Sequence, residues 1–86
     1  MNLPFKEKKI SKNEFIREFS YKNSDEFNWH KDKEDRIIEP IMETDWMIQF
    51  DNQLPKLIEG KIFIPLNIYH RLIRGSGKLK IILTKV

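Results

Sequence analysis

Turn-forming residues divide this chain into seven or eight short apolar runs, and that division limits the folds open to it. The runs recur about every 8–12 residues, and prolines and glycines lie mostly between them, as in an antiparallel sandwich or barrel. The long helical segments that connect parallel strands are absent. Composition agrees, because isoleucine occurs 13 times and alanine not at all; isoleucine favours strands and alanine favours helices. The sequence therefore predicts a small all-β domain.

The boundaries of the runs predict where the strands lie. Pro40 has no N–H to donate, which favours an edge position or a bulge in its strand. Residues 1–12 are polar and are expected to form an N-terminal arm or an edge strand, ahead of a barrel domain over residues 13–86. A hairpin is expected at residues 75–77. The predicted strands cover residues 14–20, 26–30, 36–42, 46–51, 61–65, 69–74 and 78–86.

Residues 14–20 allow two interpretations. Phe15, Ile16 and Phe19 fit one face of a helix, and Asn13 is a suitable residue to cap its first turn. In a strand, alternate residues of the same segment share one face. We favour the strand.

The charge of the chain is mild, with a net charge of +3 and a pI near 9.2. Its lysines gather near both ends, but acidic residues separate them and no aromatic RNA-binding motif accompanies them, so a nucleic-acid partner is not expected. No run approaches the roughly 18 apolar residues of a membrane span, and the N-terminal segment is charged where a signal peptide is apolar. We therefore expect a soluble, cytoplasmic protein, and its small size favours a homodimer.

Two segments concentrate the residue types that bind metals or small ligands. In the first, Asn28 and His30 share a strand face and an acidic turn follows them. In the second, a proline-led turn precedes His70. The chain has no cysteine, so any metal site must use imidazole and carboxylate ligands. Such ligands suit Zn, Fe, Mn or Ni, as in a non-haem iron oxygenase or a metal Lewis acid. The pattern does not decide which carboxylate would bind the metal, and the candidates are Asp32, Glu34 and Asp35.

These two segments resemble the paired motifs of the cupins, a family of small β-barrels. Cupins carry a first motif of His-x-His, three or four further residues and Glu, and a second motif in which Gly precedes a strand that leads to Pro-x-Gly-x-x-His. The run from Asn28 to Glu34 resembles the first motif, with Asn28 in place of one histidine. The run GKIFIPLNIYH, which ends at His70, resembles the second, with Asn67 in place of the turn glycine. Asn tolerates the left-handed conformation that such a turn requires.

The resemblance implies a jelly roll, or double-stranded β-helix, with a site inside its barrel. By that resemblance, one divalent ion would be held by His30, Glu34 and His70, and no catalytic residue is assigned. The residues expected to bind a small polar or anionic ligand beside the ion are Asn28, Gln49, Tyr69 and Arg71. The stretch WHKDKEDR is also similar to small stand-alone cupin-like proteins of unknown function, some of them encoded by phages.

Two other interpretations stay open. The order His30-x-Asp32, followed later by His70, resembles the ligand order of the 2-oxoglutarate oxygenases, which are also double-stranded β-helix enzymes. In the second interpretation, Asn28 in place of a ligand histidine indicates a metal-free cupin-like module. Such a module would bind a small ligand or act as an accessory to a protein or nucleic-acid partner, without catalysis.

Overall fold

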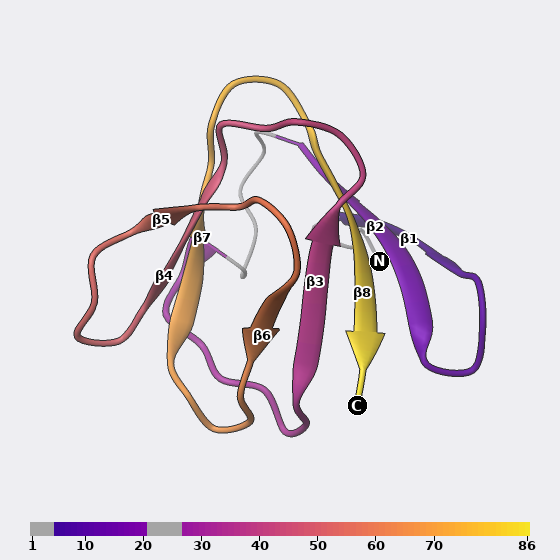
Figure 1. Ribbon diagram of the computed structural model, residues 1–86, viewed down its shortest axis with the longest axis horizontal. Coiled ribbons are helices and arrows are strands. Elements are labelled where there is room, and N and C mark those ends of the chain that lie inside the picture. The colour runs from indigo at the N-terminus through magenta and orange to yellow at the C-terminus, as the bar shows by residue number, and fades with distance from the viewer. Residues whose placement is uncertain (1–4, 21–26) are drawn as a thin grey trace.

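The computed structural model describes residues 5–20 and 27–86, and these residues form two antiparallel β-sheets without an α-helix (Figure 1). The larger sheet has the order β1-β2-β8-β3-β6, in which the strands span Phe5–Lys9, Glu14–Phe19, Leu79–Lys85, Arg36–Pro40 and Ile62–Ile64. The smaller sheet has the order β5-β4-β7, with strands Lys56–Leu57, Met47–Phe50 and His70–Ile73. The predicted all-β fold is confirmed. Within the described ranges, no helix is long and apolar enough to cross a membrane.

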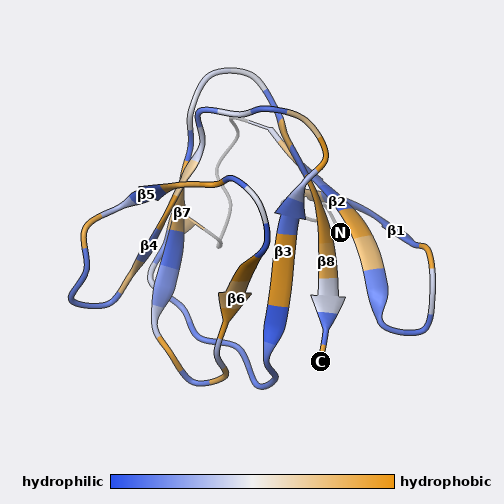
Figure 2. Cartoon of the chain, in the orientation of Figure 1, coloured by the Kyte–Doolittle hydropathy of each residue, from blue (hydrophilic) through white to orange (hydrophobic). Residues whose placement is uncertain are grey.

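The core lies between the two sheets. The predicted alternation of residues 46–51 is confirmed, because Trp46, Ile48 and Phe50 are buried and the residues between them are only partly so. Strands β2, β8, β3 and β6 contribute their inward positions in the same way, while β1 contributes only the partly buried Phe5. Figure 2 shows apolar stretches along β3, β6 and β8. The buried side chains of the larger sheet are Phe19, Ile38, Ile62, Ile64, Leu79, Ile81 and Leu83.

The two sheets face each other but do not close into the predicted barrel. Among the described residues, no strand of one sheet pairs with a strand of the other. The edge strands β6 and β5 are only three and two residues long, and so offer few main-chain groups for a closing ladder. The fold is therefore an open arrangement of two sheets.

The strand interpretation of residues 14–20 is confirmed by β2. This strand pairs with β1 on one side and β8 on the other, with Ile16 opposite Ile82. Its inner face carries Phe15, Arg17 and Phe19, which gives the period of two of a strand instead of a helical period. Of the predicted arm or edge strand at residues 1–12, residues 5–9 form β1, one of the two edge strands of the larger sheet, and residues 1–4 lie outside the described residues.

Two predicted strand features are wrong. Of the predicted strand 26–30, only His30 makes a strand-type bridge among the described residues 27–30. The predicted hairpin at 75–77 does not form, because β7 and β8 belong to different sheets and the segment crosses between them. The expectation for Pro40 is confirmed, since β6 begins opposite Ile38 and leaves Pro40 paired on one side only.

The crossing between the sheets depends on a close approach at Gly75. Asp45 accepts hydrogen bonds from the main-chain N–H and the hydroxyl of Ser76, at 2.9 and 2.8 Å. A Cβ atom at Gly75 would lie 2.2 Å from Asp45 Oδ1 and 2.8 Å from the main-chain carbon of Asp45. The loop can therefore pack here only because residue 75 has no side chain.

Gly75→Ala is expected to lower the free energy of unfolding by about 1–3 kcal/mol, because Asp45 must move to admit the methyl group. Urea unfolding followed by circular dichroism measures the change. Gly60→Ala gives the cost of backbone strain without a close approach, since its Cβ would meet nothing within 4 Å but its φ is +62°. A free energy of unfolding for Gly75→Ala equal to that of the wild type would show that the close approach has no cost.

Candidate metal site

His30 and His70 lie opposite each other as main-chain partners. Each N–H donates to the carbonyl of the other residue, at 3.0 and 2.9 Å, in an isolated antiparallel bridge. Residues that are directly opposite in such a pair point to the same face. The two imidazole rings accordingly lie 4.3 Å apart between centroids, at 59°. The sequence predicted that these histidines share a site, and the structure brings them together.

Asp32 joins the two histidines because it lies two residues after His30 and so shares its face. Its carboxylate Oδ2 is 3.3 Å from His70 Nε2. One ligand atom of each of the three residues lies within 4.8 Å of the other two. Asp32 and His70 are buried and His30 is half-buried. The main-chain carbonyl of Asp32 also accepts a hydrogen bond from Asn67 N–H at 3.0 Å, which ties this segment to the turn before β7.

Both imidazoles are oriented by the carbonyl two residues earlier in the chain. His30 Nδ1 lies 2.8 Å from the carbonyl oxygen of Asn28, and His70 Nδ1 lies 2.9 Å from that of Ile68. A carbonyl oxygen only accepts, so each Nδ1 carries the proton and donates it. In a neutral imidazole the lone pair is then on Nε2, the atom that can bind a metal. Metal-binding histidines are commonly fixed in this way.

Contacts with His70 and Arg36 keep Asp32 ionised. Arg36 Nη1 lies 3.3 Å from Asp32 Oδ1, and Arg36 Nη2 lies 3.2 Å from Glu34 Oε1. Burial alone raises the pKa of Asp32. A hydrogen bond from His70, which forms when Nε2 also carries a proton, and the positive charge of Arg36 together outweigh burial and lower the pKa below its ordinary value. Asp32 is therefore a carboxylate at neutral pH.

The three side chains fit a divalent cation. Asp32 Oδ2 is buried without a hydrogen bond, and it faces Nε2 of a histidine whose proton lies on Nδ1. Two acceptors that face each other require a proton or a cation between them. Two imidazole nitrogens and one carboxylate oxygen form a ligand set that suits Fe, Mn, Zn or Ni and leaves further positions open.

Glu34, which the resemblance assigned to the metal, lies outside this group. It contacts Arg36 and Lys85, the latter at 3.8 Å, and so belongs to the charged surroundings of Asp32. The chain bends at residues 33–34, which breaks the alternation that puts His30 and Asp32 on one face. Asp35 has a different role: its carboxylate accepts a hydrogen bond from Leu66 N–H at 2.8 Å and holds the turn before β7.

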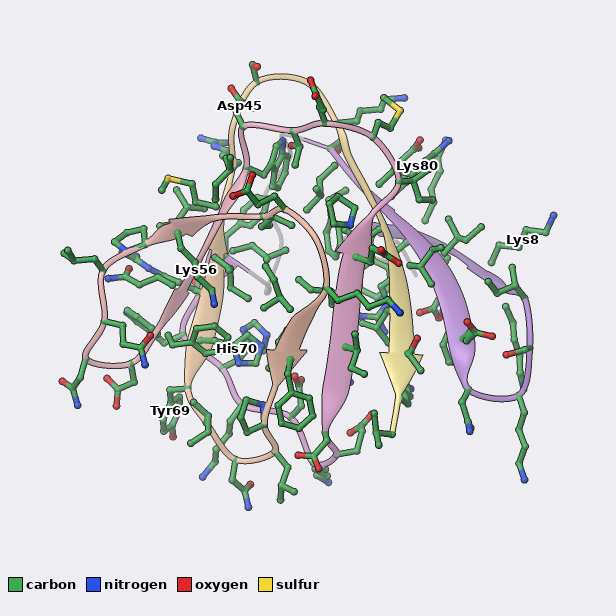
Figure 3. All side chains as sticks on the ribbon, in the orientation of Figure 1. Lys8, Asp45, Lys56, Tyr69, His70 and Lys80 are labelled. Atoms are coloured by element: carbon green, nitrogen blue, oxygen red, sulfur yellow. The ribbon has the colours of Figure 1, made fainter. Side chains whose placement is uncertain are left out.

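The residues expected to bind a ligand do not gather around the histidines. Gln49 and Arg71 are cross-strand partners on the outer face of the smaller sheet, where Arg71 Nε donates to Gln49 Oε1 at 3.0 Å. Figure 3 shows Tyr69 pointing away from the molecule while the adjacent His70 points inward. The side chain of Asn28 is exposed, and only its main-chain carbonyl serves the site, as the acceptor for His30. The strand period of two separates these residues from the inner face.

Phe50 and Lys56 are inner-face neighbours of the cluster that the sequence analysis did not single out. The ring centroid of Phe50 lies 6.1 Å from that of His70. Lys56 pairs with Ile48 in the register of β4 and β5, so its side chain shares the inner face. Its Nζ lies 5.2 Å from the Phe50 ring centroid, and Figure 3 shows it extending toward the side of His70. The alternation of residues 46–51 identifies Phe50, but nothing local to Lys56 indicates its direction.

Solved structures identify the fold, although the sequence matched neither a protein-family model nor any curated protein. A cupin-2 domain protein from Shewanella frigidimarina is 18% identical, with a TM-score of 0.66 over 96% of this chain and 81% of that chain. A cupin domain from Bordetella pertussis is 10% identical, with a TM-score of 0.63 over 99% of this chain and 96% of that one. This chain has the cupin fold.

Another structure with this cupin fold is an iron(II) form of a protein named HppE. It is 14% identical, with a TM-score of 0.61 over 85% of this chain. The present chain spans only 41% of that chain. At these identities the likeness establishes the fold alone. The left-handed turn expected of Asn67 in the second cupin-like motif is confirmed, since its φ is +61°.

Proposed function

We propose that this cupin-fold chain binds one divalent metal ion through His30, Asp32 and His70. The observation that carries the proposal is the buried Oδ2 of Asp32, which faces Nε2 of a histidine already committed to donate through Nδ1. Iron(II) is the preferred candidate, because two histidines and one carboxylate with open positions are typical of non-haem iron(II) sites. The iron(II) form of HppE, which shares the fold, supports that choice.

Three ligands leave coordination positions for a small polar or anionic molecule. An ion in this setting supplies Lewis acidity and, as iron(II), the redox chemistry of non-haem oxygenases. The chain itself fixes both Nε2 lone pairs through the carbonyls of Asn28 and Ile68 and holds Asp32 as a carboxylate beside Arg36. These fixed groups lower the cost of assembling the site around an ion.

The charges around the cluster favour an anionic ligand. A divalent ion bound by a single carboxylate keeps a net positive charge. Lys56 adds a second positive charge on the same inner face, next to Phe50. Within residues 5–20 and 27–86, no carboxylate lies within ion-pair distance of Lys56. A ligand with a carboxylate or phosphate group would satisfy both the ion and Lys56.

Metal titration tests the proposed function directly. The chain is purified without a metal-affinity tag, stripped with a chelator, and titrated with Fe(II) under nitrogen and with Mn(II), Co(II), Ni(II) and Zn(II). Calorimetry is expected to give one ion per chain, and the melting temperature is expected to rise because the ion binds only the folded state. If no ion binds in a ratio of one to one and none raises the melting temperature, the proposal is wrong.

Lys56→Gln is expected to weaken anion binding to the metal-loaded chain about fivefold, corresponding to about 1 kcal/mol, the upper end for an exposed charge. The probes are inorganic phosphate and acetate, followed by the visible absorption of the Co(II)-loaded protein. Affinity for Co(II) itself should not change. Lys12→Gln, in the exposed turn between β1 and β2, is the matched control. Equal anion affinity in wild type and Lys56→Gln would exclude Lys56 from the ligand site.

A further inference from the structure

Four side chains form a patch on the outer face of the smaller sheet, on the opposite side from the metal cluster. The two histidines of the cluster are directly opposite each other and point inward, so the residues on either side of each histidine point outward. Figure 3 shows this direction for Tyr69. In the antiparallel register, Trp29 then lies opposite Arg71, and Lys31 lies opposite Tyr69. We call these four residues the outer patch.

Each cation of the outer patch lies against the aromatic ring opposite it. The Cζ atom of Arg71 is 4.8 Å from the centroid of the Trp29 ring, and the Nζ atom of Lys31 is 5.2 Å from the centroid of the Tyr69 ring. Both distances are within the range of a cation–π contact. The two cations thus occupy one diagonal of the patch and the two rings occupy the other. Rings and cations therefore alternate along each chain segment and between the two segments.

The groups of the outer patch are oriented but not used within the chain. Arg71 stacks on Trp29 and donates from Nε to Gln49 Oε1 at 3.0 Å, which fixes the plane of its guanidinium. Within residues 5–20 and 27–86, no hydrogen bond or ion pair engages the Nη atoms of Arg71 or the Nζ atom of Lys31. Trp29 and Tyr69 are 44% and 47% exposed. A fixed guanidinium of this kind offers two parallel donors to a phosphate group.

From this alternation we propose that the outer patch binds single-stranded nucleic acid. Phosphates would contact Arg71 and Lys31, and bases would stack on the rings of Trp29 and Tyr69. Proteins that bind single strands combine cations along the backbone with aromatic rings under the bases, and a sheet face can carry both. The sequence disfavoured a nucleic-acid partner because its lysine-rich ends lack an aromatic motif. The rings and cations of the outer patch come together only through the bridge between two segments that are far apart in the sequence.

An acidic peptide is the main competing ligand, and the outer patch fits it less well. Its carboxylates would pair with Lys31 and Arg71 but would leave the two rings with nothing to stack on. Asp51 also lies beside the patch, since its N–H donates to the carbonyl of Tyr69 at 2.9 Å, and its negative charge offsets part of the attraction for any anion. The rings must therefore supply much of the affinity. Base stacking is worth about 1–3 kcal/mol per base, which bases in a single strand can provide.

Fluorescence anisotropy with labelled oligo-dT and oligo-U of about ten nucleotides tests the proposal. Binding is expected at low salt, and log K should fall with log salt with a slope of about −1.4, because two phosphate contacts each contribute about 0.7 on a single strand. Tryptophan emission should also fall, and the change reports on Trp29 because Trp46 is completely buried. Metal-free and metal-loaded chains are expected to bind equally, so failure of the proposed metal site would leave this result unchanged.

Substitutions separate stacking from charge. Trp29→Ala is expected to weaken binding about fivefold or more, the effect of losing one stacked base. Arg71→Lys keeps the charge but loses the planar fork, and should also weaken binding, whereas Tyr69→Phe keeps its ring and should bind like the wild type. Lys8→Gln on β1 is the control, because it removes one positive charge outside the outer patch. Unchanged affinity of each variant for Co(II) would show that the histidines stay in place.

Three results would overturn the proposal. The first is the absence of binding to either oligonucleotide at low salt. The second is a Trp29→Ala variant that binds as tightly as the wild type, or one that loses no more affinity than Lys8→Gln. The third is equal or tighter binding of polyglutamate, which would assign the outer patch to an acidic protein, or of a duplex, whose bases are not available to the rings.

Discussion

Asp32→Asn is expected to weaken metal binding by more than about 100-fold, whereas Glu34→Gln is expected to weaken it by less than about 10-fold. Both substitutions replace a carboxylate with an amide of the same shape. Asp32 lies within the cluster and Glu34 touches it only through Arg36. Loss of groups that merely support a metal ligand costs about 10–100-fold in affinity, and loss of the ligand itself costs more. Calorimetry with Co(II) or Zn(II) measures both constants.

The same pair of variants separates the two metal-binding patterns that the sequence allowed. A larger loss with Glu34→Gln than with Asp32→Asn would restore the cupin-like assignment and contradict the geometry. Stability of the metal-free chain is the control. The pKa of Asp32 is lowered on folding, so its contribution is present above the unfolded pKa near 3.8 and is lost as the pH falls through the folded value. The difference in stability between wild type and Asp32→Asn should therefore close in acid.

Much of the fold could be predicted from the alternation of apolar and polar residues and from the turn-forming residues between the strands. Strand β4 carried a clean period of two, and Asn67 stood where a left-handed residue was needed. These features are local, since each depends on a few neighbouring residues and the face they bury. The connection at residues 75–77 could not be predicted in the same way. The sequence of a glycine-rich turn is similar whether the turn joins two neighbouring strands of one sheet or connects strands of two sheets. In this chain only the packing of Asp45 against Gly75 distinguishes the second case from the first.

The candidate site could be predicted only in part, because its histidines lie in local motifs whereas its carboxylate depends on the path of the chain. The two histidines could be associated because each lies in a recognisable motif. The choice of carboxylate depends on where the chain leaves the extended conformation, and the bend at residues 33–34 separates Asp32 from Glu34. The spacing of two between His30 and Asp32 was the signal in favour of Asp32. Extended backbone through residue 32 is what turns that spacing into a shared face.

Three residues that were expected to bind a ligand lie on the opposite face of the smaller sheet from the histidines. Tyr69 and Arg71 are the sequence neighbours of His70, and Gln49 lies between the inner-face residues Ile48 and Phe50. A strand carries such residues to its opposite face. Lys56, by contrast, reaches the inner face through its pairing with Ile48, a contact between different strands that no local pattern encodes.

Trp46→Ala is expected to destabilise the chain by about 3–5 kcal/mol. Trp46 is completely buried, and its ring contacts Phe19 of the larger sheet at 6.5 Å and Phe27 at 5.7 Å between centroids. It thus packs between the two sheets just before β4. A small domain has only about 5–15 kcal/mol of stability in total, so the variant should be close to unfolded at room temperature.

Trp29→Ala is the matched control, because Trp29 is 44% exposed and stacks on Arg71 at the outer face. It should cost less than about 1 kcal/mol. Trp46→Phe keeps the aromatic contacts and removes the buried Nε1, which has no hydrogen-bond partner. This variant should lose less stability than Trp46→Ala. Urea unfolding measures all three, and a loss at Trp29 equal to the loss at Trp46 would contradict the position of the core.

The metal and the core are linked through folding, and Trp46→Ala can test that linkage. The ligands His30, Asp32 and His70 come together only when the segment around His30 pairs with β7, so an ion binds the folded state and stabilises it. At a free metal concentration 100 times the dissociation constant, the gain is about 2.7 kcal/mol. Saturating Co(II) should therefore restore most of the folded signal of Trp46→Ala, and should restore none when Asp32→Asn is added. Equal recovery in both variants would mean that the ion acts elsewhere on the chain.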